Sequence, residues 1–169
     1  MVADYDSATP GSTPILNKEH PVDRIVVDIL SRWLHVIFAI VLLGGGIFIR
    51  FVLQPAAAEL PEDQHAALHG RVIARWKRLV MITIGLLLLS GLYNYIFVMI
   101  PKHKGDGLYH GLMGGKMILA FVVFFLVSAL TGKSAGLQKI RDNARLWTSI
   151  TVVLGLVIVM IAGFLKIRG

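Results

Sequence analysis

The chain carries four long apolar segments that are separated by short polar ones. They run approximately over residues 29–51, 79–100, 108–131 and 146–165. Each is close to the roughly 20 residues that a helix needs to cross about 30 Å of hydrocarbon. Because lipid offers the backbone no hydrogen bonds, a crossing segment must pair its polar groups internally, as a helix does. The pattern predicts an all-α integral membrane protein, a four-transmembrane-helix bundle of up-down-up-down order.

The connection between the first two segments has a pattern of its own. Pro61 is expected to end the first helix. From Glu62 onward, apolar residues are interspersed with polar ones and lead into a basic cluster at 75–78. This pattern is typical of a short amphipathic helix at the membrane surface. His65 and His69 lie on it, and we expect both to be solvated surface residues without a functional role.

The remaining polar stretches divide the chain into an N-terminal tail and a membrane domain with two further connections. Residues 1–28 are expected to form a polar N-terminal tail, and residues 29–169 a four-helix membrane domain. The connections at 101–107 and 132–145 are expected to be a compact turn and a basic loop. No positively charged stretch precedes an apolar one at the start of the chain, so the tail is not expected to be a cleavable signal peptide.

The composition agrees with a membrane protein and excludes several other classes. Of the 169 residues, 56% are hydrophobic and 16% charged, whereas soluble domains are about 45–50% apolar and about 25% charged. A disordered chain would be poor in apolar residues. The absence of cysteine excludes a disulfide scaffold, a zinc finger and an iron–sulfur site.

The net charge of +7 indicates an orientation rather than a nucleic-acid partner. The basic residues lie between the apolar segments, where Lys and Arg mark the cytoplasmic side. The first and third connections carry nine of them, and the 101–107 turn carries two. We therefore expect both termini and that turn to lie outside. The expected partner is the lipid bilayer and not nucleic acid.

Ionisable groups inside hydrocarbon are costly and are candidates for function. His35, His110 and Lys116 are such groups, and the expected orientation puts them all in the outer half of the bundle. On the third helix His110, Met113 and Met117 share one face, since they lie three and seven residues apart. Imidazole and thioether ligands suit Cu(I). The pattern predicts a metal site of His35, His110, Met113 and Met117, with packing filler as the alternative for the methionines.

Some of these residues also suit a porphyrin. His with Met is a known axial pair for haem iron, and the small residues Ala39 and Gly46 on the face of His35 allow a flat macrocycle to approach. Lys116 is able to pair with a propionate or to extend toward the headgroups. The alternative for His35 is a hydrogen bond between packed helices. The predicted cofactor-binding residues are His35, His110 and Lys116, for copper or haem b. No carboxylate lies in the four segments, so a carboxylate proton relay is not expected.

Three stretches carry a resemblance to a known family. The chain resembles the copper-resistance D (CopD) family and the related HemJ-type membrane proteins over about residues 32–168. The stretches that carry the resemblance are WLHVIFAIVLLGGGIFIRFVLQPAAAEL, RWKRLVMITIGLLLLSGLYNYI and YHGLMGGKMILAFVVF.

The resemblance implies two functions in a bacterial inner membrane. CopD-like proteins are associated with copper tolerance or copper movement, and HemJ-type proteins are b-haem-binding protoporphyrinogen oxidases. His35 and Lys116 match the important histidine and lysine of the HemJ type, whereas residues 49–55 depart from its pattern. Copper handling is the first expectation and a haem redox protein the second. A structural or assembly subunit is the third, and a homo-oligomer or a redox or metal-delivery partner is compatible with each.

Overall fold

The described part of the chain is a bundle of long helical columns. A computed structural model describes residues 21–168, and within these residues there are helices and turns but no strand. The first column consists of α1 (Pro21–Phe48), the π-helical η1 (Ile49–Leu53) and α2 (Gln54–Ala58). The second consists of α3 (Glu62–Tyr93), the π-helical η2 (Asn94–Met99) and α4 (Ile100–Lys102). The third and fourth are α5 (Gly107–Thr131) and α7 (Ala144–Arg168), joined through η3 (Ala135–Leu137) and α6 (Gln138–Asp142).

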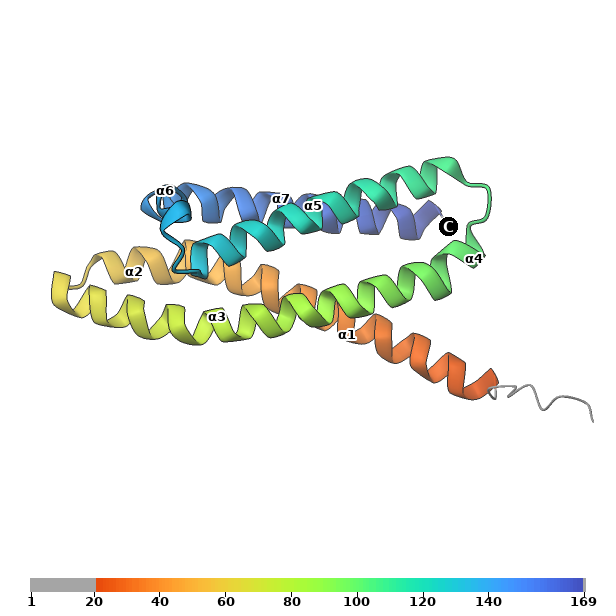
Figure 1. Cartoon of the computed structure of the whole chain (residues 1–169), viewed down its shortest axis with the longest axis horizontal. Helices are drawn as coiled ribbons and strands as arrows, with labels where there is room; N and C mark the ends of the chain where they lie inside the picture. The colour runs from red at the N-terminus through yellow and green to blue at the C-terminus, as the bar shows by residue number, and fades with distance from the viewer. Residues whose placement is uncertain (1–20, 169) are drawn as a thin grey trace, which may run out of the picture.

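The columns are long and apolar enough to cross a membrane, so the predicted four-helix membrane fold is confirmed. Figure 1 shows α1 beside α3 and α5 beside α7, and these are the two closest helix pairs. Contacts of α3 with α5 and of α1 with α7 join the pairs, which gives the up-down-up-down order. We call the end with α4 and the C-terminus of α7 the α4 end, and the opposite end the α6 end.

Two element boundaries differ from the sequence prediction. The amphipathic helix expected in the first connection is not a separate element but the beginning of α3, which continues unbroken because no proline interrupts it from Glu62 to Tyr93. Helix α1 begins at Pro21 and not near residue 29. Proline suits a first helical turn, because its missing N–H has no partner there. The rest of the predicted tail, residues 1–20, lies outside the described residues.

Both π-helical stretches lie just ahead of a proline. Pro55 follows η1 and Pro101 follows η2. A proline ring clashes with the carbonyl four residues before it and offers that carbonyl no N–H. In each case that carbonyl lies within the π-helical stretch, where the wider turn accommodates it. The first and second columns therefore continue through their prolines, which the sequence analysis did not foresee.

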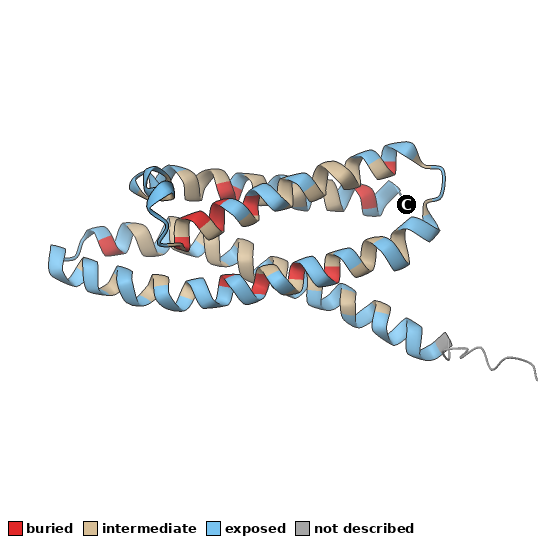
Figure 2. Cartoon of the chain, in the orientation of Figure 1, coloured by how far each residue is buried: buried red, intermediate tan, exposed pale blue. Residues whose placement is uncertain are grey.

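The buried residues are few and lie where the helices face one another (Figure 2). Val80, Val123 and Val127 form a core with the partly buried Leu42 and Trp76. Many large apolar side chains are instead exposed on the outside of the bundle, such as those along the first turns of α1. Such a surface is the one that lipid would cover.

A glycine sets how closely the first pair of helices packs. A Cβ added at Gly45 would overlap the indole of Trp76, whereas one added at Gly44 would meet nothing within 4 Å. Glycine at position 45 therefore lets the Trp76 ring lie directly on the α1 backbone, as small residues do between membrane helices.

The Gly45→Ala variant should destabilise the bundle, because overpacking of a filled contact costs about 1–3 kcal/mol. Gly44→Ala is the matched control and should not lower stability, because its Cβ meets nothing and alanine favours a helix more than glycine does. The measurement is the thermal unfolding midpoint in detergent, followed by circular dichroism. Equal midpoints for the two variants would contradict the close packing of Trp76 on α1.

Candidate functional site

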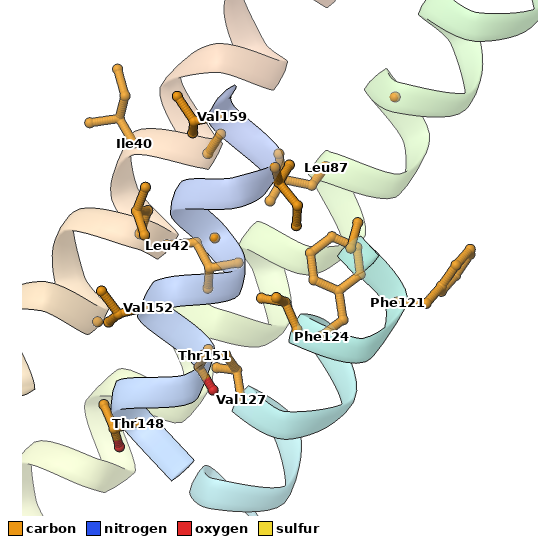
Figure 3. Close-up of a pocket in the computed structure, with 18 of the residues that line it drawn as sticks. Ile40, Leu42, Leu87, Phe121, Phe124, Val127, Thr148, Thr151, Val152 and Val159 are labelled. Carbon is orange, nitrogen blue, oxygen red and sulfur yellow. The ribbon is translucent and has the colours of Figure 1, made fainter. Parts of the chain in front are cut away.

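A large cavity lies between the two helix pairs and is lined by all four columns. Its volume is about 1660 Å³, above the roughly 300–1,000 Å³ of ordinary small-molecule pockets. The middle stretch is apolar, and Figure 3 shows side chains from several columns converging there, among them Leu42, Leu87, Phe124 and Val152. The cavity can therefore hold an apolar body of considerable size.

The charged side chains that line this cavity are all basic. The α4 end contributes Arg32, Lys102, Lys116 and Lys166, and the α6 end contributes Arg50 and Arg145. Among the described lining residues there is no aspartate or glutamate. Side chains of one sign along low-dielectric walls create a strong local potential. This cavity should therefore attract anionic groups and repel free cations.

A hydrogen-bond chain assigns the role of His35 Nδ1 as a donor. Its Nδ1 lies 3.0 Å from Ser90 Oγ, and that hydroxyl donates its proton to the carbonyl oxygen of Leu86 at 2.6 Å. A serine hydroxyl has a single proton, so the Ser90 oxygen accepts the hydrogen bond from Nδ1–H. In the neutral ring the lone pair is then on Nε2, which is the form of histidine that binds metals.

Local sequence on α3 makes room for this ring. A Cβ at Gly91 would lie 2.9 Å from Cε1 of His35, so glycine allows the imidazole to lie against the α3 backbone. One turn earlier on α1, the Ser31 hydroxyl donates to the Ser90 carbonyl at 3.4 Å. The ring is half-buried and held from the side of α3.

Asp28 is a further member of this polar seam that the sequence analysis missed. The hydroxyl of Tyr93 donates to Asp28 Oδ1 at 2.9 Å. Because α1 begins earlier than expected, the first membrane-spanning column does carry this carboxylate. The spacing of Asp28, Ser31 and His35 at one helix face is the signal that could have found it.

Three other predicted residues line the same cavity as His35. They are Met113, Lys116 and Met117, all half-buried on α5. Lys116 is the charged member of this set. The structure thus brings the predicted histidine of α1 and one face of α5 to a common space.

His110 does not join them. It is not among the described residues that line the cavity. Its Nε2–H donates to the backbone carbonyl of His103 at 3.1 Å, and its ring meets the edges of Tyr95 and Tyr109. The ring of His103 in turn stacks on Tyr109, with centroids 3.7 Å apart. His110 therefore packs the turn at the α4 end.

The protein alone offers few metal ligands at this site. Among residues 21–168, no group of three or more His, Asp or Glu side chains is placed to hold a metal ion. A metal ion beside His35 would need thioether ligands from α5, or it would need to be held in a cofactor that supplies further ligands.

Comparisons with known proteins do not add to this description. No protein-family model matches the chain, and neither a curated protein nor a solved structure does. The resemblance to the CopD and HemJ-type proteins therefore remains a prediction from the quoted stretches.

Asp106 joins the beginning of α5 to the end of α7 at the α4 end of the bundle. Its carboxylate caps α5 by accepting the Tyr109 backbone N–H at 3.0 Å, and it lies 3.6 Å from the Arg168 guanidinium at the end of α7. The Tyr109 N–H, with a further contribution from Arg168, holds the pKa of this carboxyl below its ordinary value of 3.8.

The Asp106→Ala variant should lower the unfolding midpoint by a few degrees at neutral pH, because the helix cap and the ion pair are both lost. A lowered pKa stabilises the folded state above the ordinary value, so the part of this difference that comes from the charge should fade as the pH falls through the pKa of the folded protein. Asp106→Asn is the control, since it keeps the cap and loses the charge. Midpoints measured across acidic pH by circular dichroism test this, and a difference between the wild type and Asp106→Asn that persists in strong acid would contradict it.

Proposed function

We propose that the chain is a membrane haem protein that holds haem b in the cavity, with His35 as an axial ligand of the iron. The observation that carries the proposal is the hydrogen bond from His35 Nδ1–H to Ser90, which leaves the Nε2 lone pair available beside a cation-lined space. Haem is a flat apolar macrocycle with two carboxylates. It needs one or two axial ligands, apolar walls and cationic partners, and this site supplies each kind.

The walls around His35 fit a flat body. Side chains at its level are small on several columns, which leaves space for a planar ring. Among the small residues that line the cavity are Ala39, Gly91, Ala120, Ala162 and Gly163.

The basic residues of the α4 end fit the propionates. Lys116 and Arg32 line the cavity from α5 and α1. A carboxylate in low dielectric requires a charge-assisted hydrogen bond, and a buried cation requires an anion in the same way. A propionate would satisfy both requirements, whereas a free copper ion would leave Lys116 facing another cation.

Haem when bound supplies one-electron chemistry. The residues of this chain hold and orient it: His35 binds, Ser90 sets the ring tautomer and raises the basicity of the ligand, and the apolar walls exclude water. The HemJ resemblance extends the proposal to oxidation of a protoporphyrinogen in a bacterial inner membrane. The distribution of Lys and Arg supports an orientation with both termini outside.

Copper handling is the second candidate, and one observation favours it. His35, Met113 and Met117 line the same cavity, and imidazole with thioethers suits Cu(I). It ranks below haem because His110 is engaged at the turn and because the lining cations oppose a free metal ion.

The purified protein should show a Soret band that the His35→Ala variant loses. Haem per chain should fall by at least about tenfold, because even a supporting residue costs a metal site 10–100-fold. His110→Ala is the matched control, a histidine on α5 outside the cavity lining, and should keep its haem. Absorption spectra and metal analysis check this. Colourless wild-type protein containing copper supports the second candidate, and colourless protein without metal would leave a structural or assembly subunit.

Substitution of Lys116 should weaken haem retention without abolishing ligation by His35. A hydrogen bond to a charged group is worth about 1.5–3 kcal/mol, so Lys116→Gln should bind haem roughly 10–100-fold more weakly. Lys116→Arg keeps the charge and should retain most of the affinity. Haem transfer to an apo-acceptor protein measures the difference. Equal retention by both variants would show that Lys116 does not pair with a propionate.

A further inference from the structure

The α6 end of the cavity carries two arginines that the haem proposal does not use. Arg50 belongs to the π-helical η1 of the first column, and Arg145 lies in the first turn of α7. Both line the large cavity and also a second, smaller cavity of about 390 Å³. We call the place that the two cavities share, at Arg50 and Arg145, the arginine cleft.

Ser149 holds the Arg50 guanidinium in this cleft. The Nε–H of Arg50 donates to Ser149 Oγ at 2.6 Å, and the Ser149 hydroxyl donates to the Arg145 carbonyl at 2.9 Å. Arg145 and Ser149 lie four residues apart on α7, so they share the face of that helix that Arg50 meets. Among residues 21–168, no group forms a hydrogen bond with the two terminal amino groups of Arg50. These groups are therefore available to a ligand.

The carboxylates near the cleft do not neutralise the two arginines. Neither arginine forms an ion pair within the described part of the chain. Asp142 lines the smaller cavity, but its carboxylate accepts a hydrogen bond from Gln138 at 2.8 Å. The acidic residues of the α2–α3 turn line neither cavity. Because a half-buried cation without a counter-ion is costly, the cleft favours an anionic ligand.

The position of the cleft along the helices points to a lipid as the source of this anion. Arg50 lies near the end of the apolar segment 29–51, and Arg145 directly precedes the segment 146–165. Both arginines therefore lie at the boundary between hydrocarbon and headgroups, where lipid phosphates are found. Basic pockets between transmembrane helices are known to bind anionic headgroups.

An apolar wall continues from the cleft into the large cavity. Leu53 lies three residues after Arg50, and Val152 lies three residues after Ser149. Both line the cavity. An acyl chain attached to a phosphate in the cleft can extend along this wall, where its apolar surface is removed from water. The haem proposed beside His35 lies toward the α4 end, so the two ligands use different parts of the cavity.

We propose that the arginine cleft binds the phosphate of an anionic phospholipid, such as phosphatidylglycerol, with an acyl chain in the α6 half of the cavity. A guanidinium matches phosphate oxygens with parallel N–H donors. Ser149 engages the Nε–H of Arg50 and so leaves the terminal amino groups to the phosphate. The proposal does not depend on the haem proposal.

Titration of the lipid-free full chain in detergent with phosphatidylglycerol tests the cleft. The thermal unfolding midpoint, followed by circular dichroism, should rise, since a ligand of the folded state stabilises it. The Arg50→Gln variant should need at least about tenfold more lipid for half of this rise, because a hydrogen bond between charged groups is lost. Lys139→Gln is the matched control. It removes an exposed positive charge at the same end, outside both cavity linings, and should respond as the wild type does.

Phosphatidylcholine and inorganic phosphate identify the ligand. Neither should raise the midpoint as phosphatidylglycerol does, because the first has no net charge and the second has no acyl chain. An equal rise with either of them would overturn the proposal. An unchanged response of Arg50→Gln, or an equal loss of response in Lys139→Gln, would overturn it as well.

A measurement on the wild type alone covers the case in which a variant does not fold. Phosphatidylglycerol with a photoreactive group in its acyl chain should label Leu53 and Val152 in the presence of excess phosphatidylcholine, as mapped by mass spectrometry. Val153 is the matched neighbour, since it is 57% exposed on the outside of the bundle and does not line the cavity. Labelling of Val153 without Val152 or Leu53 would overturn the proposal.

Discussion

A hydrogen bond between His35 on α1 and Ser90 on α3 sets the chemistry of the cavity. Because the Ser90 hydroxyl gives its proton to the Leu86 carbonyl, the imidazole must donate through Nδ1. The same bond joins the first helix pair, and Gly91 makes it possible by leaving space for the ring. Helix packing and ligand chemistry thus depend on one contact. The hydrogen bond between packed helices, given above as the alternative for His35, is the same bond that leaves the lone pair on Nε2.

The arrangement of the helices determines what can occupy the space beside that ring. Close packing occurs within the α1–α3 and α5–α7 pairs, and the cavity lies between them. Its apolar middle and basic lining select for a molecule that is apolar and anionic at once.

Much of the fold could be predicted from the sequence, because segment length and backbone pairing in lipid leave few choices. His35 and Lys116, which the cost of burying charge singled out as candidates for function, both line the cavity. The position of His110 outside the cavity lining could not be predicted, since its hydrogen-bond partner is the backbone carbonyl of His103, whose position depends on the turn. Ser90 was missed because a lone serine in an apolar helix carries no pattern. The π-helical stretches follow from Pro55 and Pro101 and could have been predicted from them.

Native mass spectrometry of the chain, released from detergent without denaturation, tests most directly what the cavity holds. The expected result is the 18.6 kDa chain with the added mass of a single haem, which is lost when the protein is denatured. A bare chain, or a chain that carries only copper, would contradict a haem bound at His35.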